Sequence, residues 1–552
     1  MTSSEHPQQP GELELAIIGA GFTGVQMLYS AVQHRRNVRL FDAGSSVGGT
    51  WHWNRYPGAR VDVESLVYSY SFSPELEQEW NWSERYAPQS ELLRYSNHVV
   101  DRFGLRPYIQ LNTFIASAVF DEQTHRWTLT TQTGERIRAR YFVLATGLLH
   151  AAKRLSIPGL ETFAGIQAYT SEWPEGTDYA GKRVVVIGTG SSGVQTITEV
   201  AKAAGHLTVL QRTPSYVVPA RNHTLTPEYQ QAIKARYGEL RKKQYESLSG
   251  VIPLAFLDDP HPTLNAMEVS AEKRQEVYDA CWAAGGLSFY TAFKDLLFDP
   301  AANETCAEYV RGKIREVIED PAKAEKLVPK YPILARRLCA GTGYFEVYNQ
   351  PNVDLIDVNE APIERAVPEG LIVGGKLVPC DLLIFATGFD ALTGAIEKID
   401  VRGRGGRTIK EHWADGVTTY AGMMCAGFPN LIMMNGPTSP SAFWAPIQIA
   451  EYQADWIERC VDHLARHGLD CIETRPECEQ DWMDAVERIA RPTLFSQVKS
   501  WYLGDNISGK KHRMLIYLGG YAEYTAECER GAANAYQKFD LSRSVREAAI
   551  AT

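Results

Sequence analysis

The chain has 552 residues, 44% of them hydrophobic, and a formal net charge of −10. This length allows two or three domains with large hydrophobic cores. The acidic balance argues against non-specific binding to nucleic acid or to anionic membranes. No apolar run approaches the ~18 residues that a membrane helix needs.

The start of the chain and its cysteines indicate the compartment. Residues Met1 to Glu14 lack the basic and apolar regions of a signal peptide. The nine cysteines include no C-x-x-C pair, which excludes redox-disulfide chemistry and fits a reducing cytosol. We therefore expect a cytoplasmic monomer that binds neither nucleic acid nor membrane. His463 and His467 lie four residues apart without the glutamate of an H-E-x-x-H motif, so we predict no metal site.

The first predicted strand, Leu15 to Ile18, leads into the turn Gly19-Ala20-Gly21-Phe22-Thr23-Gly24 and then a helix. In a G-x-G-x-x-G pattern the glycines allow a tight turn, close approach of a pyrophosphate, and close packing of helix on strand. The second predicted strand, Val38 to Phe41, is followed by Asp42, 18 residues after Gly24. A carboxylate there binds ribose hydroxyls, so these residues predict a site for either NAD or FAD.

A second glycine turn, Gly188-Thr189-Gly190-Ser191-Ser192-Gly193, follows the predicted strand Val184 to Ile187. The next strand, Leu207 to Gln211, is followed by Arg212, 19 residues after Gly193. A guanidinium attracts a 2′-phosphate that a carboxylate would repel. The second site therefore reads as one for NADP(H), unless Arg212 is only a solvated surface side chain.

Two short apolar strands, Tyr141 to Gly147 and Leu382 to Gly388, both end in Ala-Thr-Gly. We predict that each closes a nucleotide-binding domain, with its last glycine near a cofactor or a linker; two unrelated buried strands are the alternative. Between Arg221 and Pro329 charged helical patterns dominate, with start signals at Thr226-Pro227 and Asp320-Pro321. This stretch predicts a helical insertion in the second domain.

Several longer motifs carry a resemblance to a known family. The segment Gly48-Gly49-Thr50-Trp51 through Tyr56-Pro57-Gly58 to Asp62 resembles a fingerprint of the Baeyer–Villiger monooxygenases. Phe163-Ala164-Gly165 with Trp173-Pro174 is similar to a second fingerprint of that family. Further matches are Trp80-Asn81-Trp82, Gln211-Arg212-Thr213-Pro214, Ala386-Thr387-Gly388-Phe389-Asp390 and Ser500-Trp501-Tyr502.

The resemblance covers nearly the whole chain and implies an α/β flavoprotein with two Rossmann-like domains. With the bounds set by the strand and helix patterns, we expect the FAD domain at residues 1–147 and 382–552, the NADP domain at 148–220 and 330–381, and the helical insertion at 221–329. The implied reaction is reduction of FAD by NADPH, addition of O2 at flavin C4a, and attack of the resulting peroxide on a ketone to give an ester or a lactone.

This chemistry needs a fixed positive charge, because the attacking peroxide must be an anion. In the motif match Arg337 takes the position of the catalytic arginine, and Asp62 that of the acid that pairs with it. An arginine keeps its proton throughout. Arg336 resembles a basic residue that joins Arg212 on the 2′-phosphate, and Trp501 an indole that holds the nicotinamide nucleotide. The alternative for Arg336 and Arg337 is a basic pair on the surface, and the alternative for Trp501 is plain packing in the core.

The expected contacts can be grouped by ligand. Those of FAD are Gly19, Gly21, Phe22, Thr23, Gly24, Asp42, Thr50, Trp51, Asp62 and Tyr68. Those of NADPH are Thr189, Gly190, Ser191, Ser192, Gly193, Gln195, Arg212, Thr213, Arg336, Arg337 and Trp501. Phe443, Trp444 and Leu149 are expected to line the ketone pocket, although Phe443 and Trp444 suit packing inside the domain equally well.

One position departs from the family pattern, since Tyr169 stands where the linker fingerprint has histidine. Tyrosine keeps the ring and a hydroxyl but cannot become cationic near neutral pH. We expect oxygenation to be retained, with altered handling of NADP(H); simple tolerated drift is the alternative. Two rival functions remain: a flavin monooxygenase that oxygenates nitrogen or sulfur, and a flavoprotein that transfers electrons without oxygenating.

Overall fold

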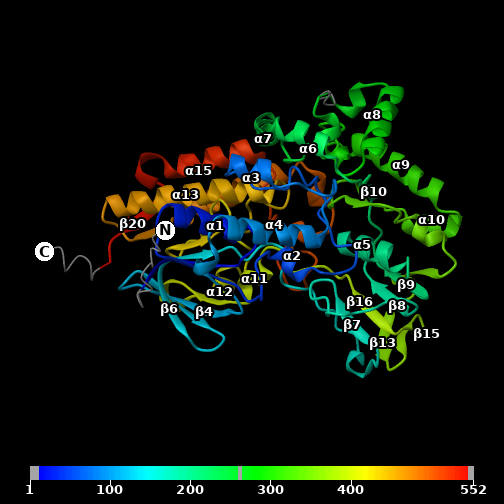
Figure 1. Ribbon diagram of the computed structural model, residues 1–552, viewed down its shortest axis with the longest axis horizontal. Coiled ribbons are helices and arrows are strands. Elements are labelled where there is room, and N and C mark those ends of the chain that lie inside the picture. The colour runs from blue at the N-terminus through cyan, green and yellow to red at the C-terminus, as the bar shows by residue number, and fades with distance from the viewer. Residues whose placement is uncertain (1–11, 259–263, 545–552) are drawn as a thin grey trace.

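Two sheets, each built on one of the two glycine turns, organise the chain (Figure 1). The computed structural model describes residues 12–258 and 264–544. Three segments lie outside the described residues: 1–11, 259–263 and 545–552. They contain most of the polar start and a few positions of the predicted domains. No helix in the described ranges combines the length and the apolar character needed to cross a membrane.

The first sheet is centred on β1 (Leu13–Ile18), which runs parallel to β2 (Val38–Phe41) and to β6 (Arg136–Leu144). Strands β4 (Ile115–Asp121) and β5 (Arg126–Thr131) extend it by antiparallel pairing. The strand order is β17-β4-β5-β6-β1-β2-β3, with β18 beside β6. The short strands are β3 (Ile109–Gln110), β17 (Asp400–Arg402) and β18 (Leu431–Met433).

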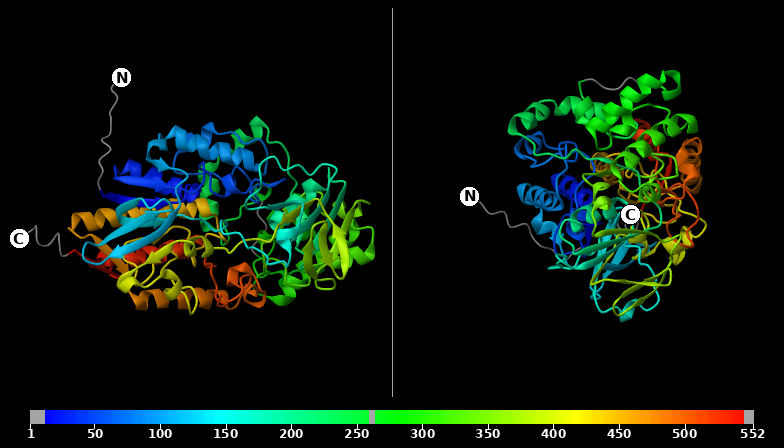
Figure 2. Two further views of the ribbon diagram at one scale, coloured as in Figure 1. Left: turned by 90° about the horizontal axis from the view of Figure 1, so that it is seen from below. Right: turned by 90° about the vertical axis from the view of Figure 1, so that its right-hand side faces the viewer.

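Helices from both ends of the chain cover this sheet. Helix α1 (Phe22–Gln33), which follows the first turn, packs against α13 (Pro446–Arg466). Figure 2 shows the blue and the orange-to-red segments side by side in one domain, as a discontinuous first domain requires. The other helices of this domain are α2 (Thr50–Trp53), α3 (Pro74–Glu79), α4 (Gln89–Arg102), α11 (Gly394–Glu397), α12 (Ile409–His412), α14 (Pro476–Ala490) and α15 (Gly520–Tyr536), and its last strands are β19 (Cys471–Thr474) and β20 (Phe539–Ser542).

The second sheet is parallel throughout, in the order β12-β9-β8-β16-β7. Its strands are β7 (Ile166–Tyr169), β8 (Arg183–Ile187), β9 (His206–Gln211), β12 (Val353–Asp357) and β16 (Leu382–Phe385). Helix α5 (Ser191–Val200) follows β8. An antiparallel meander adjoins it: β13 (Ile363–Val367), β14 (Gly370–Val373) and β15 (Lys376–Pro379).

Sheet membership corrects the boundary predicted at Leu382. Strand β16 pairs with β7 and β8, so residues 382–385 belong to the second sheet and not to the first domain. The chain rejoins the first sheet only at β17. A buried apolar strand such as Leu382–Phe385 suits the middle of either sheet equally well, and composition alone does not tell them apart.

The two Ala-Thr-Gly strand ends take part in the same packing arrangement. Gly19 and Gly188 both have positive φ, +107° and +109°. A Cβ on Gly19 would clash with the carbonyl oxygen of Ala145, and one on Gly188 with that of Ala386. Each glycine turn is therefore pressed against the Ala-Thr-Gly end of the neighbouring strand in its own sheet.

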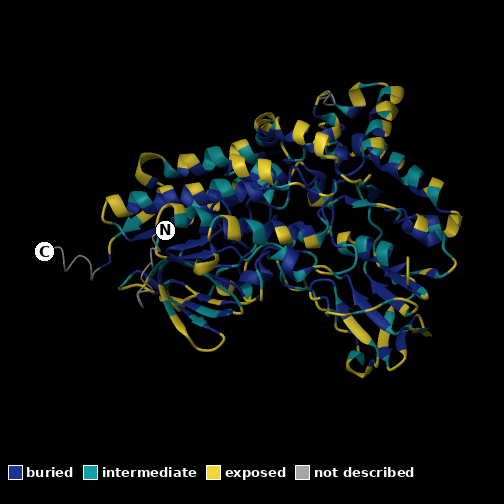
Figure 3. Ribbon diagram, in the orientation of Figure 1, coloured by how far each residue is buried: buried dark blue, intermediate teal, exposed yellow. Residues whose placement is uncertain are grey.

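The predicted helical stretch contains α6 (Pro227–Lys234), α7 (Tyr237–Glu246), α8 (Ala271–Ala284), α9 (Pro300–Val317) and α10 (Pro321–Leu327). Thr226 and Asp320 cap α6 and α10 as expected. Side chains of α8 and α9 form a core together with Tyr216, Val218 and Leu338 from the flanking segments, whereas Leu240 of α7 joins the core of the first domain. In Figure 3 these helices show exposed outer surfaces around buried inner ones.

Candidate active site

The first glycine turn is shaped to hold a pyrophosphate. A Cβ on Gly24 would clash with the carbonyl oxygen of Gly19, so α1 begins directly against the end of β1. Asp42 accepts hydrogen bonds from the backbone N–H groups of Ala20 and Gly44, each at 2.6 Å. Its carboxylate thus lies against the turn, at the carboxyl edge of the sheet where nucleotides bind in such folds.

Polar and aromatic groups extend this cradle away from the turn. The Asn435 amide donates to the Thr23 hydroxyl at 2.9 Å, and its own Oδ1 is buried without a partner among the described residues. The Trp51 indole N–H donates to the Tyr68 hydroxyl at 3.2 Å, and the Tyr68 ring lies 5.6 Å from that of Phe22. Thr50 begins α2 beside them. The Asn435 Oδ1 atom, which has no partner among the described residues, and the glycine turn without side chains fit a flavin dinucleotide.

The second glycine turn has the same backbone form and two links to its surroundings. Gly190, Ser191 and Ser192 lie at the open N-terminus of α5, where free N–H groups attract phosphate. Thr189 donates to the Thr213 carbonyl at 2.9 Å. The Tyr56 hydroxyl donates to Oε1 of Gln195 at 2.9 Å, so α5 is joined to a loop of the first domain.

Two arginines, Arg212 and Arg336, lie beside this turn. Arg212 is exposed at the end of β9 and forms no ion pair among the described residues. Arg336 donates to the Lys499 carbonyl at 2.7 Å, and its Nε is buried without a partner among those residues. Burial, together with the charge of Arg212, lowers the pKa of Arg336. Two unneutralised guanidinium groups fit the 2′-phosphate of NADPH.

Arg337 and Asp62 form a two-point ion pair between the domains. Nε and Nη2 of Arg337 donate to the two carboxylate oxygens of Asp62 at 2.9 and 3.0 Å. Burial works to lower the pKa of Arg337, but the charge and hydrogen bonds of Asp62 outweigh it and raise that pKa above its ordinary value. Nη1 has no partner among the described residues. The ion pair uses two of the five N–H donors of the guanidinium, so a permanent positive charge remains there with both N–H groups of Nη1 available.

Aromatic side chains surround this arginine. The Tyr290 ring meets that of Phe443 edge-on at 6.5 Å, Phe443 meets Phe495 at 5.8 Å, and Phe495 meets Tyr502 at 5.4 Å. Burial raises the pKa of Tyr290 and of Tyr502, and the charge of Arg337 works against that rise in both. These rings form an apolar wall around the charged group.

The predicted substrate and nicotinamide residues are placed differently. Trp501 lies at 4.1 Å from the Tyr502 ring, close to the arginine, and Phe443 is part of the wall. Trp444 instead packs against Tyr245 and Tyr521 and donates to the Ser247 carbonyl at 3.2 Å. Leu149 is 38% exposed and does not belong to the apolar wall.

Sequence reasoning did not single out Tyr290, Tyr502, Phe495 or Asn435. Tyr502 stands beside Trp501 in a matched motif, and this position was the available signal for it. Asn435 precedes the loop that contains Phe443 and Trp444. Tyr290 lies in the insertion, in a stretch without a recognisable spacing, and offered no signal.

Tyr169, the departure from the family pattern, lies on β7 away from Arg337. The centroid of its ring lies 4.4 Å from that of Phe385, and the two rings are stacked. The Arg154 guanidinium lies over the Tyr169 ring, 4.0 Å from its centroid. Arg154 in turn pairs with Glu172. The tyrosine therefore fills a packing position in the segment that joins the domains.

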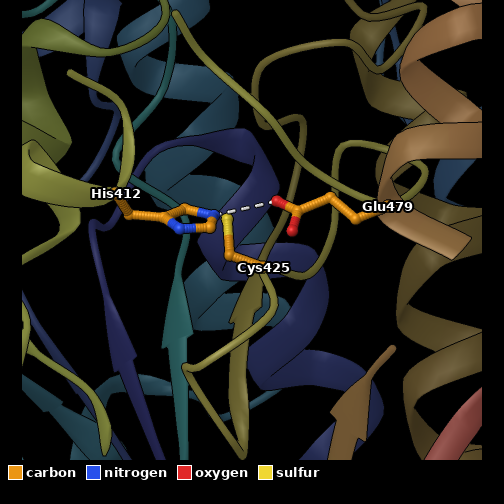
Figure 4. Close-up of side chains that lie close together, drawn as sticks. All are labelled: His412, Cys425 and Glu479. Atoms are coloured by element: carbon orange, nitrogen blue, oxygen red, sulfur yellow. Dashed lines mark hydrogen bonds and ion pairs between the residues drawn. The ribbon is translucent and has the colours of Figure 1, made fainter. Parts of the chain in front are cut away.

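A separate buried cluster lies in the first domain (Figure 4). The ligand atoms of His412, Cys425 and Glu479 lie within 4.8 Å of one another. His412 bonds Glu479 at 2.9 Å, and Cys425 donates to the Thr418 carbonyl at 3.3 Å. Nδ1 of His412 has no partner among the described residues, whereas a metal-ligating histidine almost always donates its second N–H. The arrangement fits a hydrogen-bonded brace between α12 and α14.

Comparison with known proteins agrees with this geometry. Residues 16–249 match a family described as pyridine nucleotide-disulphide oxidoreductase; that stretch contains no cysteine, so the match concerns nucleotide binding rather than disulfide chemistry. The chain is 42% identical to a phenazine N-monooxygenase of Lysobacter antibioticus, over 95% of this chain and 96% of that protein. It is 39% identical to a Baeyer–Villiger monooxygenase of Pseudooceanicola batsensis, over 93% of each chain.

A solved structure gives the same result. Cyclohexanone monooxygenase from Rhodococcus sp. Phi1, bound to NADP⁺, superposes with a TM-score of 0.93 at 41% identity, covering 97% of this chain and all of that one. The chain belongs to the Baeyer–Villiger monooxygenase family. As a Baeyer–Villiger monooxygenase it has the two-domain flavoprotein fold that its motifs indicated.

Proposed function

We propose that the chain catalyses the NADPH- and O2-dependent oxidation of ketones to esters or lactones, with FAD at the first glycine turn and NADPH at the second. The observation that carries this proposal is the Arg337–Asp62 pair, which holds a permanent cation among aromatic rings. When bound, FAD and NADPH supply the reducing equivalents and the site at which O2 is activated.

Arg337 stabilises the negative charge that develops in this reaction. Asp62 fixes two of its nitrogens, so the guanidinium does not have to reorganise when negative charge develops. Nη1 then donates to the ketone oxygen as that oxygen becomes an oxyanion. Because arginine does not titrate, this stabilisation persists across the pH range of the enzyme. The aromatic wall holds the apolar part of the ketone and excludes water.

The second turn and its cations select the reductant. The N-terminus of α5 would hold the pyrophosphate, and Arg212 with Arg336 the 2′-phosphate. At the first turn, Asp42, Thr23 and Asn435 would hold the flavin nucleotide. Gln195 joins α5, which follows the second turn, to the Tyr56 loop of the first domain.

The rival oxygenation of nitrogen or sulfur needs an electrophilic, protonated oxidant, for which a cation beside the reacting oxygen is no help. The relative from Lysobacter antibioticus is named for attack on nitrogen, so the test includes a phenazine. The purified protein, loaded with FAD, is incubated with NADPH and 18O2 and with linear, cyclic and aryl ketones, an aryl sulfide and a phenazine.

We expect esters or lactones carrying one 18O atom, with NADPH consumed in step. Oxidation of only the sulfide or the phenazine, with an Arg337→Ala variant equally active, would establish the rival function. NADPH consumption without 18O in any product would indicate electron transfer alone.

A further inference from the structure

One tyrosine reaches the candidate site from outside both nucleotide domains. Tyr290 follows α8 in the helical insertion, and it packs against the insertion core and the first-domain core alike. Such a position places a side chain of the insertion at the junction of the domains, next to the reacting groups.

The backbone that presents Tyr290 is held tightly. Gly285 and Gly286 both have positive φ, +72° and +61°. The N–H of Gly286 donates to the Pro219 carbonyl at 2.8 Å, and a Cβ on Gly286 would clash with the Tyr86 hydroxyl. The Ser288 hydroxyl donates back to the Gly285 carbonyl at 2.5 Å. This turn admits only small residues and fixes where the next residues point.

The Tyr290 hydroxyl lies in the environment of the ion pair. The Tyr290 ring packs in the hydrophobic cluster that contains Leu338, the residue that follows the arginine. Burial raises the pKa of the Tyr290 hydroxyl, the charge of Arg337 works to lower that pKa, and the charge of Asp62 adds to the rise. The edge of the Tyr290 ring meets Phe443 at 6.5 Å. The Tyr290 ring is therefore part of the apolar wall, and its hydroxyl lies within the electrostatic influence of the ion pair.

We propose that Tyr290 binds the substrate directly: its hydroxyl donates a hydrogen bond to the carbonyl oxygen of the ketone, beside Nη1 of Arg337, while its ring contacts the apolar body of the ketone. This inference rests on the proposed function. It assigns the insertion a share in substrate selection, and it favours ketones whose apolar body packs on the wall that Tyr290 and Phe443 form.

The chemistry suits the position. A ketone oxygen has two lone pairs and accepts from two donors at once. Burial raises the pKa of Tyr290, so the phenol keeps its proton at neutral pH and remains a donor. Arg337 alone would hold the carbonyl oxygen at one point, whereas a second donor on another element fixes the plane of the carbonyl group.

The test compares Tyr290→Phe with wild type. The change removes one hydrogen bond to a neutral acceptor, so kcat/KM for a cyclic or aryl ketone should fall about tenfold. The rate of NADPH consumption without ketone and the KM for NADPH should not change, because neither involves the carbonyl group. A merely structural role would instead move all of these quantities together.

Tyr278→Phe is the matched control. Tyr278 lies in the same insertion core, and its hydroxyl bonds Thr305 at 2.8 Å, so this variant should keep the wild-type kcat/KM for the ketone. Equal ketone kinetics in Tyr290→Phe and wild type would overturn the inference. If wild type made no ester from any ketone, the proposed function itself would fail, which is a different result.

A second measurement applies if Tyr290→Phe does not fold. A crystal of the wild-type holoenzyme soaked with a cyclic lactone should place the lactone carbonyl oxygen about 2.7–2.8 Å from the Tyr290 hydroxyl. A lactone bound to Arg337 with the Tyr290 hydroxyl directed elsewhere would also overturn the inference.

Discussion

Replacing Asp62 by asparagine should separate the two halves of the reaction. The wild-type carboxylate accepts from Nε and Nη2 of Arg337 at 2.9 and 3.0 Å, with the two side chains 31% and 23% exposed. Asparagine is nearly the same size but carries no charge and offers only one acceptor oxygen. One charge-assisted hydrogen bond is lost and the other is weakened.

A hydrogen bond to a charged group contributes about 1.5–3 kcal/mol. A loss of about 2–3 kcal/mol in positioning the guanidinium corresponds to a decrease of about 30- to 150-fold in the rate of ester formation. Reduction of FAD by NADPH depends on the glycine turns and on Arg212, so it should change by less than about threefold.

The assay measures both steps in the same preparation. Stopped-flow absorbance follows anaerobic reduction of the flavin by NADPH, and product analysis follows ester formation under air. Glu64→Gln is the control, because it removes a carboxylate of the same segment that pairs with Arg85 at 2.8 Å instead of with Arg337. That variant should lose stability but keep ester formation per folded molecule. An equal decrease of both steps in Asp62→Asn would refute the reasoning.

Three further predictions concern other parts of the molecule. Arg212→Ala should raise the KM for NADPH about 10- to 100-fold and leave that for NADH unchanged, since only the 2′-phosphate is affected; equal changes for both nucleotides would contradict this role. Tyr169→His should change the H2O2 released per NADPH more than the identity of the product, because a histidine beside Arg154 alters the packing on Phe385 and can itself carry charge; an unchanged leak at equal NADPH oxidation would oppose it. Glu479→Ala should lower the free energy of unfolding by about 2–3 kcal/mol in urea titrations, because it removes the carboxylate that bonds His412 and leaves the buried N–H of Ala426 without its acceptor, whereas Glu477→Ala on the exposed side of α14 should change it by less than about 0.5 kcal/mol; equal effects would dismiss the brace.

The two nucleotide turns were predictable because their signal is local. A strand, a glycine turn and a helix are adjacent in the chain, and the clashes that a Cβ on Gly19 or Gly188 would cause explain why glycine stands there. The capping residues Thr226 and Asp320 were predictable for the same reason. The family motifs also placed Asp62 and Arg337, which are 275 residues apart in the chain.

Long-range placement was harder to predict. Strand β16 was assigned to the first domain, because its apolar run suits either sheet and only its pairing with β8 decides the matter. Tyr290 was missed, because its role comes from where a turn in the insertion meets the other domains. Phe443 and Trp444 are neighbours in the chain, yet they face different surroundings: Phe443 meets Tyr290, and Trp444 meets Tyr521.

Arg337→Ala tests the central claim most directly. In the FAD-loaded variant, the rate of flavin reduction by NADPH and the yield of 18O-labelled ester from a cyclic ketone are measured together. The account predicts that reduction persists while ester formation falls by at least about 10²–10³-fold, as expected when a group that stabilises developing negative charge is removed. Ester formation at a rate close to that of wild type would contradict it.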